Sequence, residues 1–293
     1  GRRGSAEATA RAWLYRVSFV NYITTAVFDV LMAPFEALPP LLVLIIWSVV
    51  TGIVMAVVFR CTSNQKALAE VANETSANIL AIKLFQDDLG VTFRCLLKLL
   101  HNIAQRLRHS FRPMLIMLVP MVLLLVQLAL RFEYEPLQIG ESAVVELRLA
   151  PAVWEEFNTA RIEAPDTVRV ETPAMRDSRL HTVYWRLSAM TAEPVEVRWT
   201  FGDRTIEKGI AVADSSARLL RVDTVRPGAN WLEQLLHPGE QSLDNDLPVR
   251  DIVVHHVRRV TPILNCNVPW WATFFIVSCL TAWLVRPIVK VQY

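Results

Sequence analysis

The chain has 293 residues, 53% of them hydrophobic, and a formal net charge of +2. Such a balanced charge argues against nucleic acid as the main partner. Four cysteines do not make a disulfide framework, which excludes the small disulfide-stapled secreted class.

The N-terminal part contains an apolar but interrupted stretch at residues 16–35. Phe19, Ile23 and Val30 recur at helical spacing, and the polar residues fall largely elsewhere. We expect an amphipathic helix that lies in the membrane interface. The alternative is a short fourth span over Val17–Phe35, which Asp29 disfavours because an intramembrane carboxylate is costly.

Three uncharged apolar runs follow, at residues 37–59, 113–130 and 268–285. About 20 apolar residues in a helix are enough to cross a hydrocarbon core of roughly 30 Å. An arginine directly bounds each run on at least one side. We therefore predict three transmembrane helices.

The segment between the first two spans, residues 60–112, predicts a coiled-coil hairpin. Its apolar residues follow a heptad frame in which Phe93, Leu100 and Leu107 share one seam position. A single helix over residues 62–112 would be on the order of 76 Å long and would leave the second span far from the membrane. The chain must therefore fold back, unless the expected turn is only a polar stretch within a bent rod. The residues of the expected hairpin tip are Gln86, Asp87, Asp88 and Gly90.

The charges of the loops predict the orientation in the membrane. Residues 61–112 hold seven Lys and Arg against four Asp and Glu, whereas residues 131–267 hold sixteen against twenty-one. The positive-inside rule places the first segment in the cytoplasm and the second outside. The single Asn-X-Ser/Thr pattern, at Asn73, falls in the cytoplasmic segment, which favours a bacterial plasma (inner) membrane. The predicted parts are the N-terminal segment 1–36, spans 37–59, 113–130 and 268–285, hairpin 60–112, outer domain 131–267 and cytoplasmic tail 286–293.

The outer domain predicts an immunoglobulin-like β-sandwich, so the whole chain is expected to be an α+β membrane protein. Alternation of apolar and polar residues is clear at 144–149 and 195–200. Gly202 and Asp203 indicate a hairpin turn, and residues 229–236 a short helix. The seven expected strands are 143–149, 167–170, 182–187, 195–201, 205–211, 218–222 and 251–257.

The sequence carries no strong pattern for catalysis. His255 and His256 are adjacent, and adjacent residues of a strand point to opposite faces, so they are badly placed to share a metal. There is no G-x-S-x-G elbow, P-loop or Gly-rich dinucleotide turn. We therefore expect no enzyme activity, no cofactor and no metal.

Within the spans, a few polar residues are candidates for the lining of a polar groove. Intramembrane polar groups prefer a helix interface or a wet cavity, so both hydrogen bonding between helices and a client groove remain open. Gln127 lies near the outer end of its span, which is a poor position for a groove that opens to the cytoplasm. The candidates are Ser48, Thr51, Gln127, Ser278 and Thr281.

The order of the parts carries a resemblance. Residues 27–35 (VFDVLMAPF) precede an outside-to-inside span, residues 59–65 (FRCTSNQ) lead into the hairpin, and residues 83–88 (KLFQDD) form its tip. These features resemble the three-span core of the Oxa-type, YidC-like membrane insertases, whose hairpin turn reads K-Y-x-D-D. The resemblance implies a helper that moves short hydrophobic segments from a cytoplasmic groove into the bilayer. Insertases of the bacterial type carry a buried arginine in the groove. This chain departs from that pattern, because its first span carries no charge before Arg60.

The sequence therefore favours a non-enzymatic, multi-pass membrane protein that is insertase-like or assists membrane-protein assembly. Its expected partners are the lipid bilayer and hydrophobic client segments or other membrane proteins. The alternative is a membrane-anchored binding or sensing scaffold whose outer sandwich holds a protein partner.

Overall fold

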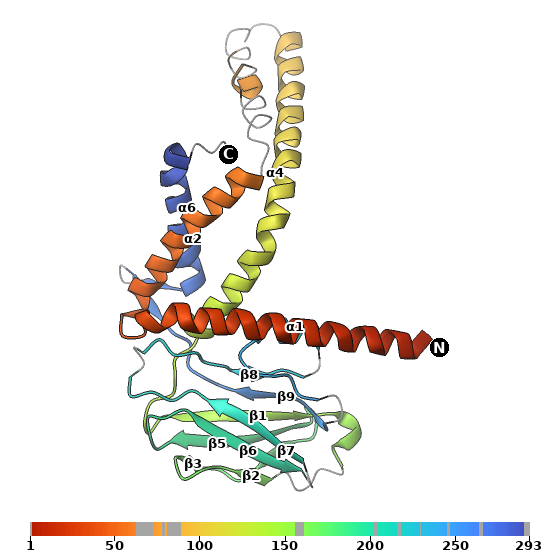
Figure 1. Ribbon diagram of the computed structural model, residues 1–293, viewed down its shortest axis with the longest axis vertical. Coiled ribbons are helices and arrows are strands. Elements are labelled where there is room, and N and C mark those ends of the chain that lie inside the picture. The colour runs from red at the N-terminus through yellow and green to blue at the C-terminus, as the bar shows by residue number, and fades with distance from the viewer. Residues whose placement is uncertain are drawn as a thin grey trace. The chain divides into compact units, whose positions relative to one another are not determined.

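The computed structural model describes residues 2–62, 73–77, 80, 89–155, 161–201, 204–215, 218–228, 230–244, 247–263 and 266–289. The chain is an α+β protein built from helices and antiparallel sheets (Figure 1). It divides into two compact units. The first unit comprises Gly1–Val43 and Leu124–Trp270, and the second comprises Leu44–Leu123 and Trp271–Tyr293.

Four helices in the described part of the chain are long and apolar enough to cross a membrane. Each of the three predicted spans coincides with such a helix, and the fourth window, Val17–Phe35, is the alternative considered for the N-terminal segment. The helices are α1 (Arg2–Met32), α2 (Pro40–Thr62), α4 (Leu89–Phe132) and α6 (Trp270–Val289). Two of these helices match their apolar windows, and the other two, α1 and α4, begin well before theirs.

Helix α1 begins earlier than the predicted segment and runs to Met32, where the short turn η1 (Ala33–Phe35) follows. Within the first unit, one face of α1 is buried and includes the polar residues Asn21 and Thr25. The opposite face is apolar and exposed, with Phe19 65% and Val30 75% exposed. The helix therefore turns polar groups towards the protein and apolar groups outward, an arrangement that suits lipid surroundings.

Helix α4 is one continuous helix of 44 residues, about 66 Å long at the usual rise per residue. Its C-terminal part, Met114–Phe132, is the apolar window, and its N-terminal part contains the second arm of the predicted hairpin. Of the expected tip, Gln86, Asp87 and Asp88 lie outside the described residues. Gly90 is the second residue of α4 and is exposed. Coiled-coil pairing with the first arm stays a prediction, since only residues 73–77 and 80 of that arm are described.

The β-structure of the first unit consists of two sheets and a small ribbon, all paired antiparallel. The larger sheet has the order β3-β5-β1-β9-β8, with β4 also paired to β5, and the smaller sheet has the order β2-β6-β7. The ribbon pairs β10 with β11. The strands are β1 (Ser142–Leu149), β2 (Arg161–Glu163), β3 (Val168–Val170), β4 (Met175–Asp177), β5 (Thr182–Ala189), β6 (Val195–Phe201), β7 (Arg204–Ile210), β8 (Val225–Arg226), β9 (Val249–Val254), β10 (Thr261–Ile263) and β11 (Cys266–Val268).

The two larger sheets share one hydrophobic core. Alternate residues of β1, including Val145 and Leu147, are buried together with Val197 and Trp199 of β6. The rings of Trp185 on β5 and Trp199 lie 6.2 Å apart between centroids, so they join the sheets at the centre of this core. The alternate apolar residues seen in the sequence therefore form the buried face of each sheet.

Six of the seven expected strands are present in the described residues, and the short helix is present as α5 (Trp231–Leu236). The prediction of a strand at 218–222 is wrong. Leu219 and Val222 are buried, but the N–H of Val222 donates to the carbonyl of Leu130 at the end of α4 instead of joining a ladder. Gly202 and Asp203 lie outside the described residues, although Phe201 pairs directly with Arg204 on either side of them.

The buried imidazole of His256 makes the first unit sensitive to acid. Its Nδ1–H donates to the carbonyl of Glu135 at 3.1 Å, and burial lowers the pKa of His256 to about 4. The unfolded chain therefore binds the proton more tightly, so this contribution is complete above about pH 6.5 and is lost as the pH falls towards 4.

We expect the free energy of unfolding of the intact protein in detergent to fall by up to about 3 kcal/mol over that interval because of His256. The measurement is chemical denaturation at a series of pH values, followed by tryptophan fluorescence. His256→Gln cannot take up the proton and should give a flatter curve. Identical pH dependence for both proteins would contradict the assignment.

Candidate functional site

Four of the five predicted groove residues belong to α2 and α6, and two of them, Ser278 and Thr281, lie where α6 approaches Gly52 of α2. Ser48, Thr51 and Ser278 are buried in the second unit, and Thr281 is half-buried. At the same contact, a Cβ placed on Gly52 would lie 2.6 Å from the backbone oxygen of Ser278. The two helices therefore approach at small residues, as is common between membrane helices.

Three of these four hydroxyl groups bond within their own helices. Ser48 donates to the carbonyl of Leu44 at 2.6 Å, Thr281 donates to Val277 at 2.8 Å, and Ser278 donates to Phe274. Hydroxyls bonded in this way present little polarity to a neighbouring chain. This geometry favours the interpretation as a packed helix interface over a polar lining.

The fifth groove residue, Gln127, lies in the first unit and bonds to α1. Its side-chain amide donates to the hydroxyl of Thr25 at 2.9 Å. One turn further, the guanidinium of Arg131 is 3% exposed and forms an ion pair with Asp29, which also accepts from Arg221 at 3.3 Å. Gln127 is therefore part of the contact that holds α1, not of the contact between α2 and α6.

Sequence reasoning missed the pairing of Asp29 with Arg131, although both residues gave a signal. Asp29 is the one acidic residue of Val17–Phe35, and Arg131 closes the second apolar run. A carboxylate in an apolar helix and an arginine at the end of another each need a partner of opposite charge. The sequence does not show which of its arginines would pair with Asp29, and in the structure both Arg131 and Arg221 do.

A stripe of apolar side chains follows one side of α4 from its arm into its apolar window. Its members are spaced alternately three and four residues apart, so they lie on one face of the helix. All are exposed, from 51% for Leu97 to 68% for Leu107 among the larger side chains. The α4 stripe consists of Phe93, Leu97, Leu100, Ala104, Leu107, Phe111, Met114 and Leu118.

The charges on α4 are of one sign. From Leu89 to Phe132 the helix contains no Asp or Glu, and Lys98 is exposed on a side away from the stripe. A helix that combines an apolar stripe with only basic charges is suited to a surface that is apolar and anionic, as a cytoplasmic membrane surface is.

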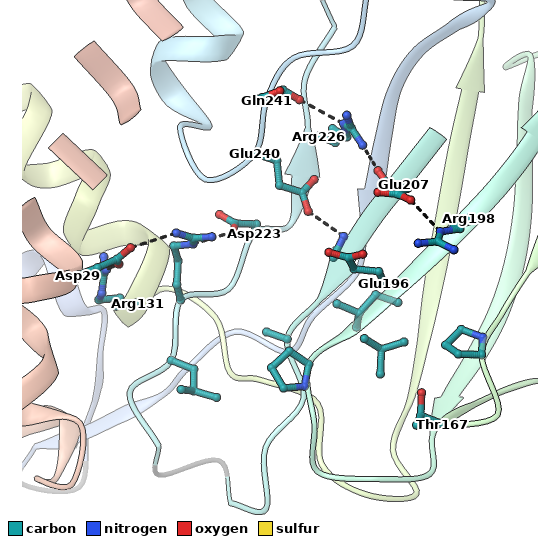
Figure 2. Close-up of a pocket in the computed structure, with 18 of the residues that line it drawn as sticks. Asp29, Arg131, Thr167, Glu196, Arg198, Glu207, Asp223, Arg226, Glu240 and Gln241 are labelled. Atoms are coloured by element: carbon teal, nitrogen blue, oxygen red, sulfur yellow. Dashed lines mark hydrogen bonds and ion pairs between the residues drawn. The ribbon is translucent and has the colours of Figure 1, made fainter. Parts of the chain in front are cut away.

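The first unit contains a cleft of about 1180 Å³, here named the domain cleft. Figure 2 shows its charged side chains pointing towards one another, from Asp29 and Arg131 at one end to Arg198 at the other. Seven carboxylates line it against four arginines. They are Asp29, Glu36, Glu163, Glu196, Glu207, Asp223 and Glu240, and Arg131, Arg198, Arg221 and Arg226.

A buried ion pair lies beside the domain cleft. The ammonium of Lys208 is fully buried, lies 3.1 Å from a carboxylate oxygen of Glu240 and also donates to the carbonyl of Asp223. Burial lowers the pKa of Lys208 and raises that of Glu240, and the attraction between the two charges opposes both effects. The pair fixes the segment around Glu240 against β7. No group of three His, Cys, Asp or Glu residues in the described part of the chain is arranged to hold a metal.

The expected histidine pair is divided between two environments. His255 is exposed and its Nε2 lies 2.7 Å from a carboxylate oxygen of Glu146, whereas His256 is buried. Neither arrangement supplies a nucleophile with an adjacent base in the way that acid–base or covalent catalysis requires.

Comparisons of the chain with protein-family models, with curated proteins and with solved structures find no match.

The close approach at Gly52 predicts a large effect from one methyl group. Gly52→Ala should destabilise the second unit by about 1–3 kcal/mol, because the new Cβ would overlap the backbone of Ser278. Thermal unfolding of the purified protein in detergent measures this. Gly90→Ala, at an exposed helical position, is the control and should be neutral or slightly stabilising. Equal melting temperatures for the two variants would show that α2 and α6 do not meet at Gly52.

Proposed function

We propose that the chain crosses a plasma membrane three times, through α2, the apolar window of α4, and α6. Residues 60–112 then lie in the cytoplasm and the β-structure lies outside, as the loop charges favour. Helix α1 lies along the outer membrane surface. The contacts of Asn21 with the carbonyl of Gln234 and of Asp29 with Arg221 support this, since they hold α1 beside the β-structure along much of its length.

Within this topology, we propose an insertase-like or assembly-assisting function without enzymatic chemistry. The observation that carries it is the α4 stripe, which offers a continuous exposed apolar path along one helix from the cytoplasmic arm into the bilayer. The order of helices also fits the resemblance to Oxa-type insertases. The clients would be short hydrophobic segments that must travel from water to lipid.

The energetics of the stripe suit a transient site. Covering one exposed Leu or Phe side chain contributes on the order of 1–2 kcal/mol, so contact with three or four of them holds a segment without trapping it. Further along α4, the same stripe is surrounded by lipid, which receives the client's apolar surface equally well. The client can therefore move along the helix with its apolar surface covered throughout, so exposure of that surface to water adds no large barrier.

The contact between α2 and α6 has a different role in this proposal. Its hydroxyls are satisfied internally, so it would act as a packed support and not as the polar groove expected from sequence. The client path would be apolar and basic. It would shield the apolar side chains of the client from water, and would do less to help charged groups of the client cross the membrane.

The topology predicts different access to two introduced cysteines. In a background without native cysteines, a Cys at the exposed Glu193 should react with an impermeant thiol reagent added to intact cells, because the β-structure is outside. A Cys at the exposed Asn73 should react only after the membrane is permeabilised. The reverse pattern would invert the orientation and remove the basis of the proposal.

The insertion function predicts a dependence on the α4 stripe. Leu100→Gln with Leu107→Gln should slow insertion of a short hydrophobic client into reconstituted vesicles by roughly tenfold, since two apolar contacts are lost. The matched control is Lys98→Gln with Gln105→Ala, away from the stripe, which should stay close to the parent. The readout is protease protection of the client.

Two results would overturn the insertion proposal. One is that vesicles with the parent protein insert the client no faster than empty vesicles. The other is that the stripe and control variants are equally active while circular dichroism shows both to be folded.

A further inference from the structure

The two larger sheets each end in a strand that lines the domain cleft. Strand β7 is the last in the order β2-β6-β7, and β8 is the last in the larger sheet. Residues of both, including Glu207 and Gly209 on β7 and Arg226 on β8, line the cleft (Figure 2). Among the strands that the structure describes, none pairs with the outer edge of β7. A sheet edge of this kind is a template for another strand.

The register of β7 identifies which backbone groups point into the cleft. In an antiparallel pair, the N–H and C=O of alternate residues point towards the neighbouring strand or away from it. The N–H of Gly209 donates to a carboxylate oxygen of Glu240 at 2.8 Å, and the C=O of Glu207 accepts from the guanidinium of Arg226. The backbone groups of positions 205, 207 and 209 therefore point away from β6, and Glu207 and Gly209 line the cleft.

The neighbouring part of the same edge already accepts a main-chain partner. Just beyond β7, Leu137 pairs with Val212 in a parallel bridge, donating to the carbonyl of Ala211 and accepting from the N–H of Ala213. The edge thus has two parts. At 211–213 backbone groups are bonded to backbone, whereas at 205–209 the bonds that are present come from long charged side chains.

The charges around this edge favour a basic partner. Carboxylates outnumber arginines in the cleft lining by seven to four. Ion pairs with Arg131, Arg198, Arg221 and Lys208 involve four of the carboxylates, and the other three are Glu36, Glu163 and Glu196. Glu196 projects from β6 next to the edge and is exposed. An incoming lysine or arginine would find carboxylates within the cleft, and an incoming carboxylate would meet repulsion.

We propose that the edge of β7 at residues 205–209 is a strand-addition site for an extended polypeptide segment with basic side chains. The incoming main chain takes the positions now held by the guanidinium of Arg226 and the carboxylate of Glu240. Backbone hydrogen bonds hold the segment, and the carboxylates of the cleft select its side chains. The site lies on the β-structure and does not depend on the proposed insertion function.

The test uses the full-length protein in detergent and a fluorescent, end-capped octapeptide of alternating lysine and valine. Fluorescence anisotropy measures its dissociation constant. Glu207→Pro removes one N–H that points into the cleft and leaves the ladder to β6 intact, so binding should weaken at least about tenfold. Glu207→Ala removes the same carboxylate but keeps the N–H, so it is the reference variant, and Glu207→Pro should bind the peptide at least about tenfold more weakly than Glu207→Ala does.

Two peptide controls keep the result interpretable if Glu207→Pro fails to fold. The octapeptide N-methylated on its four central residues has lost backbone donors, and the octapeptide with glutamate in place of lysine has the opposite charge. Both should bind the parent protein at least about tenfold more weakly.

The proposal is overturned if the lysine peptide does not bind the parent protein. It is also overturned if the N-methylated peptide binds as well as the unmodified one, since the contact is then electrostatic only, or if the glutamate peptide binds equally. Client insertion by Glu207→Pro should equal that of the parent, so failure at this edge and failure of the insertion function are separate results.

Discussion

The carboxylate of Asp29 is the group on which the arrangement of the first unit depends. Arg131 stands at the end of an apolar window, and its side chain is almost completely buried. A buried guanidinium without a counter-charge is strongly unfavourable, so α1 must bring Asp29 to it. Asp29 also accepts from Arg221, which belongs to the loop before β8. One side chain therefore joins α1, the end of α4 and the β-structure.

This constraint explains how the polar and apolar faces of α1 are oriented. Once Asp29 is fixed, Asn21 and Thr25 lie on the same side of the helix and meet Gln234 and Gln127. The apolar side chains are left on the opposite face. In the second unit, the buried hydroxyls of Ser48 on α2 and Ser278 on α6 bond to carbonyls of their own helices. In both places polar side chains turn inward and bond within the protein, an arrangement that suits lipid surroundings.

The sequence predicted the elements whose signal is local. Uncharged runs predicted α2 and α6, and strict alternation predicted β1 and β6, because hydropathy and period depend only on neighbouring residues. Strands of two or three residues, such as β2, β4 and β8, are too short to show a period. The pairing of Asp29 with Arg131 joins residues 102 positions apart, and no local pattern records such a contact. The stretch 218–222 was predicted wrongly for another reason: its apolar residues Leu219 and Val222 are buried without a ladder, and the N–H of Val222 bonds to Leu130 at the end of α4.

The edge of β7 is protected by the side chains of Arg226 and Glu240, and not by the backbone features that protect most sheet edges. Proline, a bulge or a covering strand blocks an edge permanently, whereas Arg226 and Glu240 reach it with the ends of flexible side chains. These caps satisfy buried backbone groups in the free protein and leave when a main chain with the same groups arrives. At the C=O of Glu207 and the N–H of Gly209, the proposed exchange replaces one hydrogen bond by another.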